Sequence, residues 1–125
     1  DVYKRQAWDK TIKKNPLNND YGTYCSPECP LTRPVTENIL VWSKKQYTLE
    51  DVEGFGTDIT KNEFEKWSWN SWHISPYVAP GNPHPCSFPV KLIEPILKFY
   101  TYPNDLILDS YAGVSTTALA CKKIL

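Results

Sequence analysis

In residues 106–117 the chain reads Leu-Ile-Leu-Asp-Ser-Tyr-Ala-Gly-Val-Ser-Thr-Thr, an apolar run followed by an acid, a turn of small residues and a helix start. The apolar run predicts a short buried strand, and Asp109 follows at its carboxyl end, where open α/β sheets bind ligands. Gly113 permits a tight turn before a helix whose cap is Ser115 or Thr116. Because the free amides of a helix start attract carboxylates and phosphates, we expect a strand-turn-helix unit that binds a cofactor.

The same segment resembles the cofactor loop D-P-F-x-G-S-G-T-T of S-adenosylmethionine-dependent DNA methyltransferases that modify amino groups. Residues 84–92 read H-P-C-S-F-P-V-K-L and are similar to the H-P-x-x-F-P-x-x-L segment of this family, at the expected distance before the loop. Residues 33–45 look like its R-x-x-x-E-x-I-L-V-x-x-K signature, and residues 58–72 look like its D-I-T-x-x-E-F-x-x-W passage. The loop and the H-P segment, found in this order, are a more specific signal together than either is alone.

The loop departs from the family pattern at two places. Ser110-Tyr111 replaces Pro-Phe, and Val114-Ser115 replaces Ser-Gly, so that one glycine is missing. A β-branched valine rarely adopts a positive φ. The loop must therefore avoid that conformation at Val114 or carry strain.

The resemblance implies an α/β fold, a partial Rossmann-like methyltransferase fold made of a fragment of a mostly parallel sheet with flanking helices. Residues 1–48 would hold sheet strands and a loop that follow the catalytic motif. Residues 49–83 would form a short insertion like a target-recognition region, with a linker. Residues 84–125 would form the helix, strand and loop that bind the cofactor.

The resemblance also implies methyl transfer from S-adenosylmethionine to an exocyclic amino group in double-stranded DNA, with adenine N6 favoured over cytosine N4. The catalytic motif [DNS]-P-P-[YFW] has no match. Ser75-Pro76-Tyr77 is a shortened version in the wrong place, so we predict no catalytic residue and expect this chain alone to be inactive. The expected partners are DNA and either the missing catalytic portion or a second copy of the chain.

By resemblance, two sets of residues receive roles. The cofactor would contact Phe88, Asp109, Tyr111, Ala112, Gly113, Ser115, Thr116 and Thr117, and DNA would contact Arg33, Lys44, Lys45 and Trp72. Structural alternatives stay open for several of them: a plain helix cap for Thr116 and Thr117, a solvated strand end for the two lysines, core packing for Trp72, and pairing with Glu37 for Arg33.

Composition fits a globular protein or part of one: 125 residues, 41% hydrophobic, with five Trp. The net charge of zero is distributed as +3 over residues 1–48, −4 over residues 49–70 and +1 thereafter. Only the first segment has the sign that a polyanion prefers, and solubility alone could explain it. Without an 18-residue apolar run or a signal peptide, we expect a cytoplasmic protein with no membrane partner, of bacterial, archaeal or phage origin.

The four cysteines do not form a zinc pattern. Cys25 and Cys29 have three residues between them, while Cys86 and Cys121 have no second pair, and two separated His do not complete a site. We interpret all four as reduced thiols and predict no metal. The chain has no Met and starts abruptly at Asp1, which favours an excerpt from a longer protein.

Two helices outside the loop are predicted. Thr60 and Glu63 match a capping box, so a short helix should begin there. Pro89 fits the first turn of a helix toward Tyr100, and Pro95 should kink it or shorten its first segment.

Two other functions compete with the methyltransferase. A relic could keep the recognition surface while its altered loop no longer holds the cofactor. An unrelated nucleotide-binding α/β module would explain the strand-turn-helix, but neither residues 84–92 nor residues 33–45.

Overall fold

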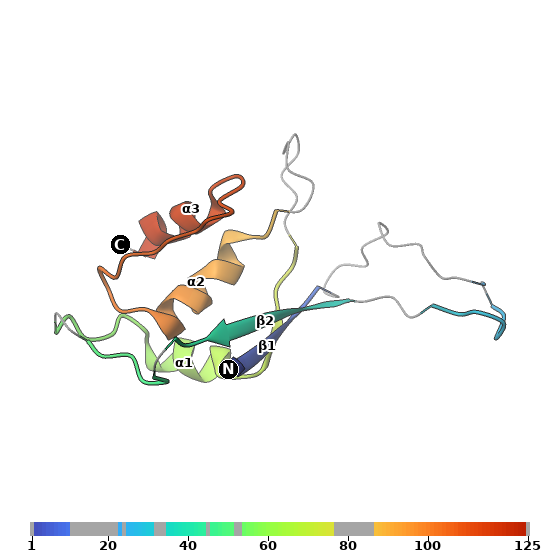
Figure 1. Ribbon diagram of the computed structural model, residues 1–125, viewed down its shortest axis with the longest axis horizontal. Coiled ribbons are helices and arrows are strands. Elements are labelled where there is room, and N and C mark those ends of the chain that lie inside the picture. The colour runs from blue at the N-terminus through green and yellow to red at the C-terminus, as the bar shows by residue number, and fades with distance from the viewer. Residues whose placement is uncertain are drawn as a thin grey trace.

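The computed structural model describes residues 2–10, 23, 25–31, 35–44, 46–51, 54–76 and 87–124. Its elements follow one another as β1 (Val2–Asp9), β2 (Thr36–Trp42), α1 (Lys61–Trp67), β3 (Ser71–His73), α2 (Val90–Tyr100) and α3 (Thr116–Ile124). The helix α2 lies between the sheet and α3, so that the described part is layered as sheet, α2 and α3 (Figure 1).

The described sheet has three strands in the order β2-β1-β3. β1 and β2 are antiparallel from Val2 opposite Trp42 to Asp9 opposite Thr36, whereas β1 and β3 are parallel over only three residues. The expectation of a mostly parallel sheet is therefore wrong. A parallel pair needs a crossover connection, and in the described chain β2 and α1 come between β1 and β3. β2 is the next described strand after β1 and returns beside it.

Residues 106–108 do not form the predicted strand. They are extended, but no strand of the described chain pairs with them, and Leu106 and Leu108 are 97% and 89% exposed. The apolar pattern identified a segment with strand character, yet a strand exists only when a neighbouring backbone takes its hydrogen bonds. This expectation is also corrected.

The core joins the sheet to α2. Trp8 and Trp72 are cross-strand neighbours in the parallel pair, and both pack with Leu92 of α2. Each indole finds a backbone acceptor: Nε1 of Trp8 donates to the carbonyl of Ile74 at 2.7 Å, and Nε1 of Trp72 donates to the carbonyl of Trp67 at 2.9 Å. Each indole N–H therefore has a hydrogen-bond partner, and that bond offsets the free-energy cost of removing it from water.

The predicted capping box at α1 is confirmed. The Glu63 amide donates to Oγ1 of Thr60 at 3.3 Å, and the Thr60 amide donates to Oε2 of Glu63 at 2.9 Å. Phe64 of α1 stacks on Phe99 of α2 with ring centroids 5.3 Å apart. The short helix is thus fixed at its start by its own sequence and along its side by α2.

The predicted helix toward Tyr100 is confirmed as α2, but it runs from Val90 without a shortened first segment. Pro95 lies inside it with a fully buried ring. The missing proline amide removes one hydrogen bond, and burial of the ring in the core offsets that loss. Among the described helices, none is long and apolar enough to cross a membrane.

Candidate cofactor site

Asp109 is the centre of the loop before α3. Its Oδ1 accepts a hydrogen bond from the Tyr111 amide at 3.0 Å, and its Oδ2 accepts one from Oγ1 of Thr117 at 2.7 Å. Hydrogen bonds to a carboxylate are stronger than those between neutral groups. They connect the end of the extended segment to the first turn of α3, so the loop is closed by its own residues.

The backbone of the loop turns through two left-handed residues, Gly113 at φ 52° and Ser115 at φ 62°. The amide of Ser115 donates to the carbonyl of Ala112 at 2.6 Å, which closes the turn. Val114 is not among the residues with positive φ, so the loop avoids that conformation there. The left-handed backbone conformation occurs instead at Ser115, where the family pattern has glycine.

The start of α3 supplies backbone donors. The Leu119 amide donates to the Ser115 carbonyl at 3.0 Å, which is the first hydrogen bond of the helix. The amides of Thr116 and Thr117 lie before this bond and have no acceptor within the helix. Thr116 is the first residue of α3 and is only 6% exposed, so its side chain packs inside the protein. The hydroxyl of Thr117 is directed to Asp109.

The structure brings together most of the predicted cofactor residues, because they belong to one loop. Tyr111 is 93% exposed and contributes its amide rather than its ring to the loop. Phe88 comes from another segment, immediately before α2, and is 36% exposed. Its ring remains accessible beside a helix start whose cap, Pro89, makes no side-chain hydrogen bond.

The predicted DNA contacts are scattered. Lys44 is exposed just after β2, whereas Trp72 is only 3% exposed and belongs to the core. Arg33 and Lys45 lie outside the described residues, as does the start of the H-P segment at residues 84–86. Trp72 therefore packs in the core rather than on the surface.

One pair at the carboxyl edge of the parallel strands was not foreseen from the sequence. Asp9 and His73 are register partners, and Nδ1 of His73 lies 3.0 Å from Oδ2 of Asp9. The carboxylate side chain is 16% exposed and the imidazole 62%. No local signal could have found this pair, because 64 residues separate its members and only strand pairing makes them neighbours.

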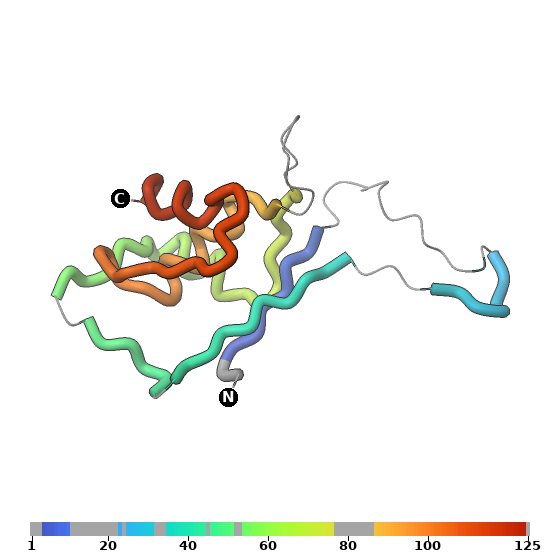
Figure 2. The backbone as a smooth tube through the Cα atoms, turned by 45° about the horizontal axis from the view of Figure 1, so that its top comes forward, coloured from blue at the N-terminus to red at the C-terminus, as the bar shows by residue number. Residues whose placement is uncertain are grey.

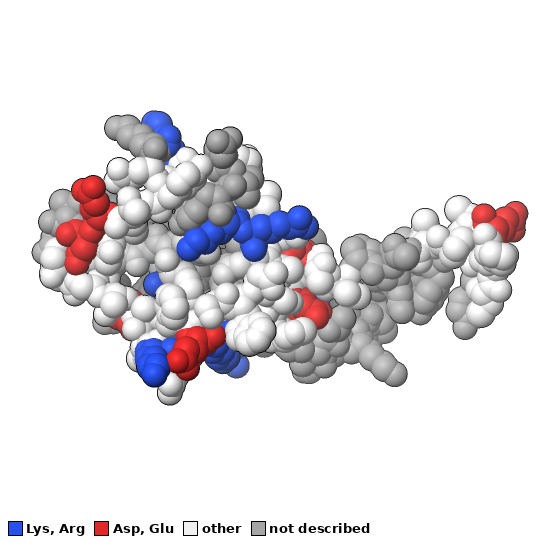
Figure 3. All heavy atoms as spheres, turned by 90° about the horizontal axis from the view of Figure 1, so that it is seen from below, with Lys and Arg blue, Asp and Glu red and all other residues white. Residues whose placement is uncertain are grey.

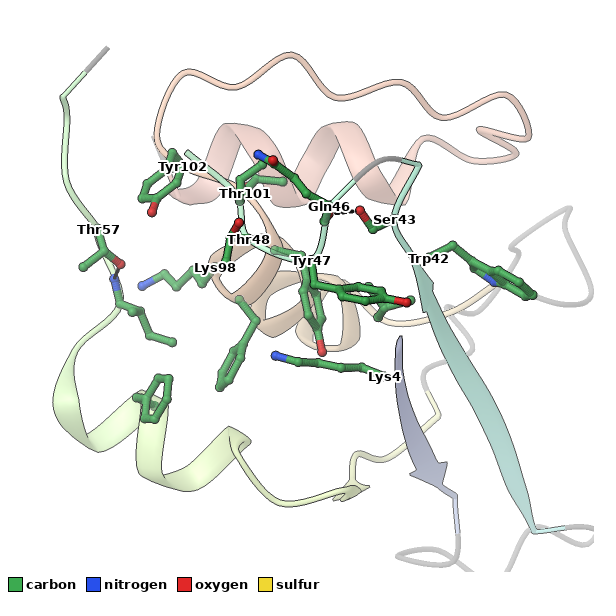
Figure 4. A pocket seen from close by; sticks show the side chains of 16 residues that line it. Lys4, Trp42, Ser43, Gln46, Tyr47, Thr48, Thr57, Lys98, Thr101 and Tyr102 are labelled. Carbon is green, nitrogen blue, oxygen red and sulfur yellow. Dashed lines mark hydrogen bonds between the residues drawn. The ribbon is translucent and has the colours of Figure 1, made fainter. Parts of the chain in front are cut away.

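A cavity of about 680 Å³ lies at the carboxyl end of α2 (Figure 4). Phe88 lies at the other end of this helix, just before its first residue. Its lining comes from β1, the end of β2 and the segment after it, the residues before α1, α1 itself, and the end of α2 with the two residues that follow. None of the predicted cofactor or DNA residues is among them. Its ammonium groups are engaged: Nζ of Lys4 lies 5.5 Å from the Tyr100 ring centroid, and Nζ of Lys98 lies 3.0 Å from Oε1 of Glu63. The cavity is separate from the loop.

The Glu63 carboxylate beside this cavity is strongly stabilised in its charged form. The backbone amide of Thr60 contributes most, followed by the Lys98 ammonium, and together they lower the pKa of Glu63 from 4.5 to about 2. The acid is thus ionised throughout the neutral range and serves the capping of α1.

Within the described ranges, no three His, Cys, Asp or Glu side chains gather as metal ligands would. Cys25, Cys29 and Cys121 are free thiols there, and Cys86 lies outside the described residues.

The DNA methylase family whose profile covers N6 and N4 amino-group enzymes matches residues 2–124. This chain belongs to that family. The match includes the loop at Asp109 and the β1–β2 pair, so the membership rests on nearly the whole sequence.

Curated relatives agree with the membership. Over 69 residues the chain is 33% identical to the type II methyltransferase M.BglI of Bacillus subtilis, which covers 51% of this chain and 20% of the relative. Over 85 residues it is 28% identical to M.BglII of the same organism, covering 66% and 23%. Over 40 residues it is 40% identical to M.PvuII of Proteus hauseri, covering 32% and 12%. The chain thus spans less than a quarter of these relatives.

A solved structure shares the fold. A candidate DNA modification methylase from Thermus thermophilus aligns with 96% of this chain at a TM-score of 0.58 and 22% identity. The aligned part is 44% of the Thermus chain. The methylase-family chain described here therefore has the architecture of under half of that protein.

Proposed function

We propose that this chain is the part of a DNA methyltransferase that binds S-adenosylmethionine. The complete enzyme would transfer a methyl group to an exocyclic amino group of DNA, with adenine N6 favoured over cytosine N4. The observation that carries the proposal is the folded loop from Asp109 to Thr117, at the family's cofactor position. Because the catalytic motif has no counterpart in the sequence, the chain alone should be inactive.

The loop residues fit the amino-acid end of this cofactor by charge and hydrogen bonding. The half-buried carboxylate of Asp109 suits an ammonium group, and the first amides of α3 suit a carboxylate. Phe88 offers an apolar ring for the adenosine end. S-adenosylmethionine supplies a methyl group activated by its sulfonium charge. The chain's own task is to bind and orient that donor.

For DNA we propose contacts by Lys44 and by the two basic residues outside the described part, Arg33 and Lys45. Figure 3 shows a group of Lys and Arg side chains near the middle of one face, with acidic side chains beside it and farther out. Basic side chains bind phosphates without reading sequence, so the three proposed contacts would position DNA rather than select a target. A DNA substrate also supports the cytoplasm as the proposed location.

Calorimetry with S-adenosylmethionine tests the proposal on this chain and on any longer protein that contains it. We expect binding by the longer protein, with Asp109→Ala abolishing it and Asp105→Ala, a carboxylate in the turn before the loop, leaving it intact. Absence of binding in both proteins would refute the cofactor role. Methylation of duplex DNA with a radiolabelled donor would then test the reaction itself.

A catalytically incomplete DNA-binding remnant is the second candidate. The left-handed Ser115 and the buried Thr116 favour it, because a loop optimised for a ligand would keep glycine at the first position. A remnant would bind duplex DNA in a fluorescence anisotropy titration but would release no heat with S-adenosylmethionine.

A further inference from the structure

The pair formed by Asp9 and His73 is held in place at the ends of two parallel strands. The two residues are opposite each other in register at the carboxyl ends of β1 and β3, and Nδ1 of His73 lies 3.0 Å from Oδ2 of Asp9. Just beyond the pair, the Ile74 amide donates to the Asp9 carbonyl at 3.3 Å, and Nε1 of Trp8 donates to the Ile74 carbonyl at 2.7 Å. The backbone that carries His73 is therefore fixed by strand pairing before it and by two hydrogen bonds after it.

The two side chains differ in exposure. The Asp9 carboxylate is mostly buried, whereas the His73 imidazole is mostly exposed. Side chains alternate along a strand, and Trp72, the residue before His73, packs in the core. His73 therefore points away from that core, and a largely buried acid orients an imidazole whose outer edge faces solvent.

Asp9 determines which nitrogen of the imidazole carries the proton. An ionised carboxylate only accepts hydrogen bonds, so the proton of a neutral imidazole lies on Nδ1, toward Asp9. The other ring nitrogen, Nε2, then presents a lone pair. The exposed edge of His73 is thus a hydrogen-bond acceptor in a fixed orientation, and its ligand must offer an N–H or O–H group.

The pair lies at the same end of the molecule as the loop at Asp109. In Figures 1 and 2, β1 and the extended segment before that loop run in the same direction, toward the side on which α2 begins. The carboxyl ends of strands are where open α/β sheets bind ligands. In the proposed function the methyl donor and a DNA base meet at this end, so a side chain exposed there lies on the DNA side.

We propose that Nε2 of His73 accepts a hydrogen bond from the exocyclic amino group of an adenine or cytosine in the major groove of the bound DNA. The inference rests on the proposed function. Adenine and cytosine present an amino donor in that groove, whereas guanine and thymine present only acceptors there. His73 is thus a specificity-determining residue for one base of the recognition site, and Asp9 is a positioning residue that acts through it.

A DNA phosphate fits this pair less well than a base amino group. A phosphate oxygen only accepts, so Nε2 would need a proton of its own to bind it. The surroundings are also acidic: Asp9 lies behind the imidazole, and Glu37, opposite Trp8 on β2, pairs with Lys10 at the same strand ends. Carboxylates repel a phosphate and attract the partly positive hydrogens of an amino group.

A binding selection from random-sequence duplex DNA tests the inference on a longer protein that contains this chain. Sequencing of the bound duplexes should show a position that holds adenine or cytosine but not guanine or thymine. His73→Asn places an amide nitrogen near the position of Nδ1, so it keeps the contact with Asp9 and removes the acceptor at Nε2. This variant should unfold at an unchanged temperature, accept all four bases at that position and bind the selected duplex about fivefold more weakly or worse.

Two further variants separate base reading from other roles. Lys44→Ala removes a proposed phosphate contact, so it should weaken binding to every duplex and leave the base preference intact. Asp9→Ala leaves the imidazole in place but frees its orientation and tautomer. It should therefore relax the same base position as His73→Asn, and no other.

Several outcomes would overturn the inference. One is an unchanged base preference in His73→Asn, which would make the pair a structural contact of the strand ends. Others are a relaxed position that held guanine or thymine in the wild type, and no selection of any sequence by the wild type. Calorimetry with S-adenosylmethionine separates the two proposals. Wild-type protein that binds no cofactor refutes the proposed function, while a base preference lost in His73→Asn still supports the role of His73; loss of cofactor binding in His73→Asn alone would assign the imidazole to the cofactor instead.

Discussion

Ser115 holds a backbone conformation that usually belongs to glycine. At φ 62° its Cβ is close to neighbouring backbone atoms, which costs an L-residue roughly 1–2 kcal/mol. The conformation persists because the bonds from Ser115 to Ala112 and from Leu119 to Ser115 hold both sides of it. Serine in place of glycine at position 115 therefore lowers the stability of the fold, whether or not a ligand binds.

Ser115→Gly should therefore stabilise the chain by roughly 0.5–1 kcal/mol, since the relieved strain exceeds the added flexibility of the unfolded glycine. Urea unfolding followed by circular dichroism measures the change. Val114→Gly is the control: Val114 lacks the left-handed backbone, so the same substitution there should destabilise. Equal effects at the two positions would contradict this account.

Thr117→Val should destabilise the loop, because it removes the 2.7 Å hydrogen bond to Asp109 while keeping the side-chain shape. Bonds to charged groups contribute roughly 1.5–3 kcal/mol, and this one is partly exposed, so a loss near the lower value is expected. Thr101→Val removes a hydroxyl bond to the Leu97 carbonyl outside the loop and serves as comparison. Only the Thr117 variant should also weaken S-adenosylmethionine binding in the calorimeter.

At the scale of elements, α1 shows how a short helix is stabilised. Its seven residues include none that is buried, so it depends on its capping box, on Lys98 and on the stacking of Phe64 against Phe99. Isolated helices of this length are marginal in water. The Glu63 carboxylate connects the cap of α1 to Lys98 of α2. Protonation of this carboxylate should therefore destabilise α1.

Stability should consequently fall in acid. The pKa of Glu63 is lowered from 4.5 to about 2 in the folded chain, so its contribution is fully present above pH 4.5 and is lost as the pH falls toward 2. Glu63→Gln keeps an acceptor in the capping box but does not titrate, so this part of the acid dependence should vanish. Thermal unfolding between pH 5 and pH 2 measures it. Glu65→Gln, at an exposed pair with Lys61, should leave the dependence unchanged.

At the scale of the whole molecule, two tryptophans join the sheet to the helices. Trp72→Ala should cost about 3–5 kcal/mol, because it empties the core between β1, β3 and α2. Trp69→Ala is the matched control, since Trp69 is 72% exposed and should change stability by no more than about 0.5 kcal/mol. Chemical denaturation of both variants decides between the core and the surface placement of Trp72. Similar losses would show that Trp69 is buried as well.

The sequence by itself determined the local features of this chain and its family. The capping box at Thr60, the helix that ends at Tyr100 and the turn at Gly113 all follow from residues within a few positions of one another. Such features need only nearby hydrogen bonds and backbone preferences. The motif at residues 109–117 is also local, which is why its residues come together in one loop.

Only the tertiary structure decided what depends on distant partners. It buried Trp72, paired Asp9 with His73, made the longer strand pair antiparallel and left residues 106–108 without a neighbouring strand in the described chain. An apolar run of three residues has the same pattern whether or not a second strand lies beside it. The reason is physical: a strand's hydrogen bonds and the burial of its side chains belong to the pair, and the partner's position is not encoded in the run itself.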